Sequence, residues 1–137
     1  MGIFVDTSAL FALVDGAALR HRQAAETWRE ALASGEPLFT SNYVLLEAHA
    51  LFQRRLGLEA VRSLESSLRP VLEVDWVDED LHAAAVAAVL AAARRGLSLV
   101  DCTSFEIMRR RGLRRAFTLD ADFASQGFEV LPQPAPA

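Results

Sequence analysis

The sequence contains no lysine, so all 14 of its basic residues are arginines. This absence excludes phosphoryl-transfer enzymes that combine an acidic pocket with an essential lysine, such as receiver domains and haloacid-dehalogenase-like phosphatases, and it excludes P-loop enzymes. The single cysteine, Cys102, excludes an internal disulfide and a zinc site made of several cysteines. The three histidines, His21, His49 and His82, are too scattered along the chain to indicate a zinc site.

Long hydrophobic runs are also missing. No run approaches the ~20 apolar residues that a membrane-spanning helix requires, and the opening stretch 3–5 is too short for a signal peptide. We therefore expect a cytoplasmic protein with no membrane association. The length of 137 residues and the hydrophobic fraction of 52% predict one domain, residues 1–131, around one core. The ending PQPAPA, residues 132–137, predicts a flexible proline-rich tail.

Short apolar stretches alternate with segments of helical spacing. Strands are expected at residues 2–6, 37–40, 71–77, 116–119 and 128–131, and helices at residues 9–14, 20–33, 41–56, 58–68, 78–95, 98–111 and, as a short turn or helix, 120–125. This alternation predicts an α/β fold in which a parallel β-sheet is flanked by helices on both faces, a three-layer sandwich. Ligands of such sheets bind beyond the carboxyl ends of the strands, near the point where the strand order reverses.

Three acidic residues follow predicted strands. Asp6 ends the first strand, and Asp120 and Asp122 follow the fourth. Each also has a structural explanation, because a carboxylate at such a position can cap the next helix. Capping and a functional role both stay open for Asp6, and only one of Asp120 and Asp122 needs to be functional.

Two further acids, Glu47 and Asp101, lie on predicted helices among apolar neighbours. Apolar residues surround Glu47 at helical spacing, so we expect its carboxylate to face inward, where it needs either a metal ion or an arginine as partner. Asp101 shares its face with Phe105 and Met108 and is also expected to point inward. Ser98 and Asp101 fit a capping box as well, and capping is compatible with metal binding.

If the fold brings these five acids together, they form one site. Clustered carboxylates repel one another, which raises their pKa values unless a cation neutralises them. Oxygen ligands without histidine or cysteine suit Mg²⁺ or Mn²⁺, and the matching chemistry is metal-assisted hydrolysis of a phosphodiester bond. The net charge of −4 argues at first against a nucleic-acid partner, but without these five acids the acidic and basic residues are nearly equal in number.

Four parts of the chain resemble, in order, the motifs of PIN-domain nucleases. They are IFVDTSAL at residues 3–10, Glu47, LSLVD at residues 97–101 and FTLDADF at residues 117–123. The resemblance implies a ribonuclease with Mg²⁺ or Mn²⁺ bound to acidic residues. The active-site residues that it implies are Asp6, Glu47, Asp101 and Asp120, with Asp122 as an accessory metal ligand and Ser8 and Thr118 as supporting residues.

In size the chain resembles the toxins of VapBC toxin–antitoxin pairs. This resemblance implies the toxin of a type II pair, a small antitoxin as partner and a homodimer. The alanine-rich segment 83–93 is most simply a close-packed helix, and part of a dimer interface is the alternative. Two alternatives stay open: a PIN-domain nuclease of RNA processing without an antitoxin, and a non-catalytic RNA-binding PIN module. The presence of every expected acid argues against the second alternative.

Arginines gather before the strand that leads to Asp120. Arg109, Arg110 and Arg114 are candidates for binding RNA phosphates beside the acids. The alternative is a solvated helix end, where the helix dipole favours cations. Arg94 and Arg95 fit that second role at the end of the preceding helix.

Overall fold

The computed structural model describes residues 1–134, in which five strands form one parallel sheet of order β3-β2-β1-β4-β5. The strands are β1 (Ile3–Val5), β2 (Leu38–Ser41), β3 (Glu73–Asp75), β4 (Arg115–Phe117) and β5 (Glu129–Leu131). In the central strand, Ile3 is in register with Leu38 of β2 and with Arg115 of β4. The outer pairings, β2 with β3 and β4 with β5, are parallel too. The predicted parallel α/β sheet is confirmed.

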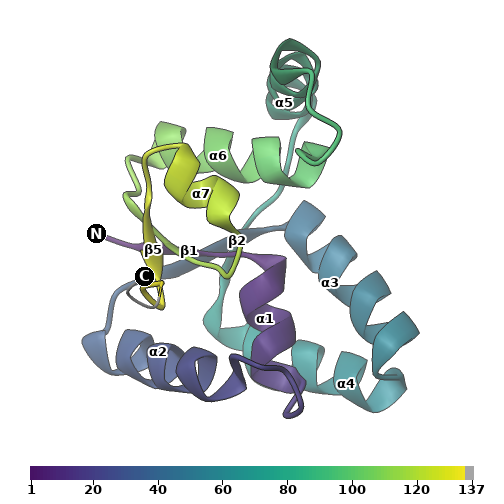
Figure 1. Cartoon of the computed structure of the whole chain (residues 1–137), viewed down its shortest axis with the longest axis vertical. Helices are drawn as coiled ribbons and strands as arrows, with labels where there is room; N and C mark the ends of the chain where they lie inside the picture. Colours follow the sequence, from purple (N-terminus) through teal and green to yellow (C-terminus); the bar gives the residue numbers. More distant parts are fainter. Residues whose placement is uncertain (135–137) are drawn as a thin grey trace.

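Helices cover both faces of this sheet (Figure 1). They are α1 (Thr7–Val14), α2 (His21–Ser34), α3 (Asn42–Arg55), α4 (Leu58–Ser63), the π-helical turn η1 (Leu64–Leu68), the 3₁₀ turn η2 (Arg69–Val71), α5 (Glu79–Ala92), α6 (Leu99–Arg111) and α7 (Ala121–Ser125). Helices α6 and α7 lie on one face, and α1, α2 and α4 lie on the other. Helix α3 packs beside α1, and α5 packs on α6, away from the sheet.

The hydrophobic core is centred on β1. Ile3, Phe4 and Val5 are at most 2% exposed, as expected for a parallel strand that is covered on both faces. Phe117 of β4 and Phe52 of α3 are also buried and belong to the same core. Because β1 is buried to its last residue, the position that follows it is also removed from water.

The segment 58–71 differs from the single helix expected over 58–68. Helix α4 passes into the π-helical turn η1 and then into the 3₁₀ turn η2. Leu64 and Leu68 both stay buried across this change of winding. Pro70 lies in η2, where a residue without a backbone N–H is compatible with the short turn that ends the helix.

Helix α5 ends earlier than expected. Ala93 adopts the left-handed conformation with φ of 52°, which is uncommon for a residue other than glycine and ends the helix at Ala92. Arg94 and Arg95 therefore belong to the connection between α5 and α6 rather than to the last helical turn.

No helix among residues 1–134 combines the length and the apolar character that a membrane span needs. The tail predicted at residues 132–137 runs into residues 135–137, which lie outside the described residues.

Candidate metal centre and active site

The candidate site lies where the strand order reverses. The chain moves from β1 to β2 and β3 on one side of the sheet and then to β4 and β5 on the other, so the reversal falls between β1 and β4. Asp6 follows β1, and Thr118 follows β4. This is the position at which parallel α/β sheets bind their ligands.

Asp6 is buried, at 4% exposure, and is held by two hydroxyl groups. Ser8 Oγ and Thr118 Oγ1 each donate a hydrogen bond to Asp6 Oδ2, both at 2.9 Å. Asp6 occupies the N-cap position of α1, but its side chain makes no capping hydrogen bond. The capping explanation for Asp6 therefore fails, and its side chain is instead fixed toward the end of β4.

The same hydroxyl groups also order the loop that carries the next acids. Ser8 Oγ accepts a hydrogen bond from the backbone N–H of Leu119 at 2.9 Å, and Thr118 Oγ1 accepts one from that of Asp120 at 3.0 Å. Each hydroxyl thus links the carboxylate of Asp6 to the β4–α7 loop. The family resemblance implies that Ser8 and Thr118 support the site. In the structure both hydroxyl groups contact Asp6 and the β4–α7 loop.

Burial raises the pKa of Asp6 from 3.8 to about 6. The hydrogen bonds from Thr118 and Ser8 act in the opposite direction, and the nearby charge of Asp101 adds a smaller increase. Burial therefore outweighs two hydrogen bonds at this position. A cation in the site would reverse the balance, because it favours the charged carboxylate.

Asp101 is the third residue of helix α6 and forms the predicted capping box with Ser98. Ser98 Oγ accepts from the backbone N–H of Asp101, and Asp101 Oδ2 accepts from the backbone N–H of Ser98, both at 3.1 Å. The pKa of Asp101 is raised, first by partial burial and then by the negative charges of Asp120 and Glu47. Asp101 is therefore close enough to both acids to be affected by their charge.

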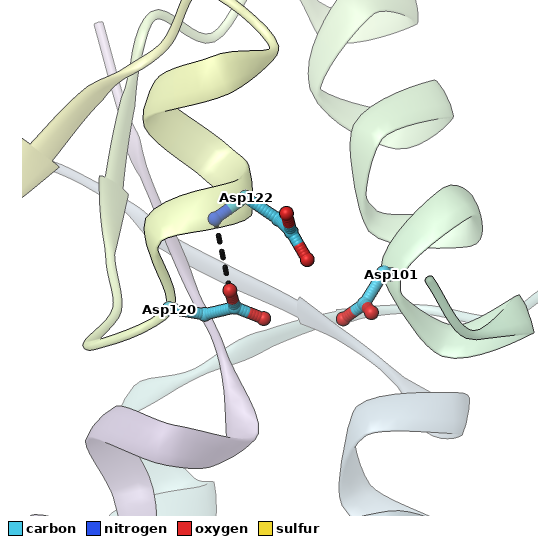
Figure 2. Close-up of side chains that lie close together, drawn as sticks. All are labelled: Asp101, Asp120 and Asp122. Atoms are coloured by element: carbon cyan, nitrogen blue, oxygen red, sulfur yellow. Dashed lines mark hydrogen bonds between the residues drawn. The ribbon is translucent and has the colours of Figure 1, made fainter. Parts of the chain in front are cut away.

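Asp101, Asp120 and Asp122 converge on one small space from two elements (Figure 2). Each offers a carboxylate oxygen, and these three oxygens lie within 4.8 Å of one another. All three residues are half-buried. Asp120 Oδ1 also caps α7 by accepting a hydrogen bond from the backbone N–H of Asp122 at 2.9 Å. Three carboxylates at this spacing, without histidine or cysteine, suit a hard divalent cation.

Glu47 is exposed, so the inference of an inward-facing, buried carboxylate is wrong. Helix α3 buries its opposite apolar positions, while Leu46, next to Glu47, is 70% exposed and Ala50 is exposed as well. The apolar neighbours of Glu47 therefore line a surface hollow rather than the core. Glu47 makes no ion pair within residues 1–134, so the alternative of a buried arginine partner fails too.

The arginine cluster lies at the far end of α6 from Asp101. Eight residues separate Asp101 from Arg109, or about 12 Å along a helix. Arg114 precedes β4, whereas Asp120 follows it, about 20 Å further along an extended chain. Arg109 and Arg110 lie in the last turn of α6, where the helix dipole favours cations, and Arg114 lies in the connection to β4. Their role in binding RNA phosphates stays a prediction.

The arginine beside the acids is Arg94. Its Nη2 lies 3.1 Å from Asp122 Oδ1, and its side chain is 55% exposed. The sequence predicts only the role of a helix-end cation for Arg94, because nothing in it relates the α5–α6 connection to a residue 28 positions later.

A parallel α/β sheet with a carboxylate cluster at its point of strand reversal fits the class of enzymes that bind a divalent metal ion with acidic side chains. The chain belongs to the PIN domain family, whose pattern matches residues 3–129. It is similar to the "23S rRNA-specific endonuclease VapC20" of Mycobacterium tuberculosis, with 40% identity over 134 residues, 96% of this chain and 99% of that protein, in both strain H37Rv and strain CDC 1551.

Solved structures give the same relationship. The crystal structure of Mycobacterium tuberculosis VapC20, described as a sarcin–ricin loop cleaving toxin, has a TM-score of 0.81 and 38% identity, and the match covers 93% of this chain and 96% of that one. FitAcB from Neisseria gonorrhoeae has a TM-score of 0.68 at 14% identity, over 93% and 95% of the two chains, and shares the fold. The expected likeness to VapC-type PIN-domain ribonucleases is confirmed.

Proposed function

We propose that this chain is an endoribonuclease that cuts the sarcin–ricin loop of 23S rRNA in the cytoplasm, as the toxin of a type II toxin–antitoxin pair. The observation that carries the proposal is the identity of 40%, over nearly the whole of both chains, with an endonuclease specific for 23S rRNA. The acidic cluster supplies the chemistry that such an activity requires.

Asp101, Asp120 and Asp122 would hold the divalent ion, Mg²⁺ or Mn²⁺. Partial burial and the neighbouring acids Asp120 and Glu47 raise the pKa of Asp101, and a divalent ion would favour its charged form. A bound ion of this kind activates water and neutralises the charge that develops on the phosphate. Glu47, exposed and near Asp101, would complete the site as an outer carboxylate.

Asp6 would act with these ligands as a further anionic residue of the metal site. Ser8 and Thr118 fix its carboxylate through Oδ2, and burial raises its pKa to about 6. A divalent ion in the site would favour the charged carboxylate. The hydroxyl groups of Ser8 and Thr118 would then hold Asp6 in one orientation toward the ion.

Cleavage of ribosomal RNA tests the proposal. Purified protein is incubated with bacterial ribosomes and Mg²⁺ or Mn²⁺, and new RNA ends are mapped by primer extension. One cut in the sarcin–ricin loop is expected, and EDTA should abolish it. Undiminished cleavage in excess EDTA, with the Asp101→Asn protein inactive to exclude contaminants, would refute the metal requirement. Absence of any cut in 23S rRNA would refute the substrate.

We further propose that the protein forms a homodimer and binds an antitoxin. An apolar hollow of about 410 Å³ beside Glu47 supports this, because exposed apolar patches mark interaction surfaces. It is lined by Leu46 and Ala50 of α3 and by Leu99 and Val100 of α6. Light scattering should report a dimer that Leu46→Glu converts to a monomer. Co-purification with the product of a neighbouring small gene tests for the antitoxin.

A further inference from the structure

A second hollow, of about 470 Å³, adjoins the acidic site. One end is lined by Ser8, whose hydroxyl donates to Asp6, and by Leu119, which precedes Asp120. The rest is formed by α1, by the α1–α2 connection and by the last turns of α3. A strand bound across the acids can therefore continue directly into this hollow.

Two arginines without acidic partners line the hollow. Arg20 and Arg55 form no ion pair within the part of the chain that the structure describes. Arg20 Nε donates a hydrogen bond to Gln23 Oε1 at 2.7 Å, but Arg20 Nη2 is buried and has no hydrogen-bond partner among residues 1–134. A buried N–H of a charged group is unfavourable unless an acceptor reaches it, and a phosphate oxygen is the acceptor that a guanidinium group binds well.

The remaining wall of the hollow is apolar. Phe11 and Leu51 are half-buried in it, and Leu19 is 100% exposed on the α1–α2 connection. The connection is tied to α1, because His21 Nδ1 donates to the carbonyl oxygen of Ala12 at 2.7 Å. This hydrogen bond fixes the start of α2, next to Arg20, against α1.

We propose that this hollow is a nucleotide subsite that binds the RNA residue next to the bond that is cut. Arg20 and Arg55 bind the backbone phosphates of that residue, and Phe11, Leu19 and Leu51 contact its base. Bases splayed out of RNA loops are commonly recognised by apolar and aromatic side chains together with arginine. The subsite rests on the proposed ribonuclease function and adds the part of the protein that selects the position of the cut.

RNA binding and cleavage test the subsite. A fluorescein-labelled RNA hairpin of the sarcin–ricin loop is titrated with protein in EDTA at several salt concentrations, and kcat and KM are measured separately with Mn²⁺. Arg20→Gln and Arg55→Gln should each weaken binding about five- to ten-fold and raise KM more than they lower kcat. The double variant should lower the slope of log Kd against log salt by about 1.4, since each phosphate contact of a single strand contributes about 0.7.

Arg54→Gln is the matched control, because Arg54 is exposed beside Arg55 and lies outside the hollow. Equal weakening by Arg54→Gln would mean general charge attraction and would overturn the subsite. Arg55→Gln changes an exposed side chain, so it tests the proposal even if Arg20→Gln impairs folding. A double variant that cuts and binds like the parent, or that loses only antitoxin binding, would overturn the subsite alone. Failure of the unaltered protein to bind or cut RNA would instead refute the proposed function.

Discussion

The two ends of helix α6 carry charges of opposite sign, acidic at the N-terminal end and basic at the C-terminal end. At the N-terminal end, Asp101 meets Asp120 and Asp122, and the one arginine that pairs with this group is Arg94, within the described residues. At the C-terminal end, each of three arginines has its own partner: Arg109 contacts Gln126, Arg110 contacts Glu106 and Arg111 contacts Asp75.

We infer from this difference that the arginines at the C-terminal end stabilise the fold, whereas the acids at the N-terminal end bind a ligand. Arginines at a helix C-terminus are favoured by the helix dipole, and their partners satisfy them further. Asp101 also gains from its position at a helix N-terminus, yet its pKa is raised because partial burial and neighbouring acids outweigh that gain. Changes at the acidic end should therefore alter activity and metal binding, while changes at the basic end should alter stability slightly.

The largest effect is expected from Asp101→Asn. The variant keeps the size of the side chain and an oxygen for the Ser98 backbone N–H, but it loses a charged metal ligand. Activity should fall on the order of 10³-fold, because the ion contributes several kcal/mol to catalysis. Thermal stability without metal should stay the same or rise, since repulsion among the acids decreases. Activity within ten-fold of the parent would remove Asp101 from the metal site.

Asp6 should make the metal-free protein less stable as the pH rises. Its pKa is 3.8 without the fold and about 6 in it, so the folded state holds this proton more tightly. The resulting stability is full below pH ~4 and is lost as the pH rises through 6, by up to about 3 kcal/mol. Urea unfolding between pH 4 and 7.5 measures this loss, which Asp6→Asn should lack. Identical pH profiles for the two proteins would show that Asp6 is already stabilised as a carboxylate.

Much of the site could be predicted from local signals. Asp6 ends a buried strand, Asp101 forms a capping box and Asp120 caps a short helix, and each of these features is a property of a few adjacent residues. The parallel sheet then brings the three segments together at one edge. The metal-site roles themselves stay predictions until they are tested.

The errors came from features that depend on distant parts of the chain. Apolar neighbours at helical spacing do not distinguish a core from a surface hollow, so Glu47 was placed inside. Helical spacing also does not show which side chains the arginines near position 110 contact, and in the structure Arg109 contacts Gln126 and Arg110 contacts Glu106. The contact of Arg94 with Asp122 depends on the left-handed turn at Ala93, which no local signal predicts.

Asp120→Asn should be more damaging than Asp122→Asn. Asparagine still caps α7, so Asp120→Asn removes only charge from the site. Asp122 already shares its carboxylate with Arg94, so its loss removes less uncompensated charge. We expect cleavage to fall about 100-fold for Asp120→Asn and about ten-fold for Asp122→Asn, with recovery of the latter at high Mn²⁺. Rates measured against metal concentration decide, and the reverse order would make Asp122 the principal ligand.

Arg94→Gln should strengthen metal binding. Arg94 competes with a cation for Asp122, and its removal leaves that carboxylate free. Calorimetric titration with Mn²⁺ should give an affinity a few-fold tighter than that of the parent protein, a small effect because the Arg94 side chain is 55% exposed and solvent weakens its attraction to Asp122. Arg95→Gln removes a neighbouring exposed charge that has no such contact and serves as the control. Weaker Mn²⁺ binding by Arg94→Gln would mean that Arg94 orders the site instead.

The smallest effect is expected at the basic end, from Arg111→Gln. The guanidinium group of Arg111 pairs with Asp75 and lies 4.3 Å from the ring centroid of Phe39, so it joins the end of α6 to β2 and β3. The pair raises the pKa of Arg111, but the side chain is 42% exposed, so solvent weakens the attraction. Loss of both contacts should lower the free energy of unfolding by about 1 kcal/mol, measured with urea. Cleavage rate and Mn²⁺ affinity should not change, because Arg111 lies ten residues along the helix from Asp101. A loss of activity larger than the loss of stability would mean that the basic end also binds RNA, and the contrast between the two ends of α6 would then no longer hold.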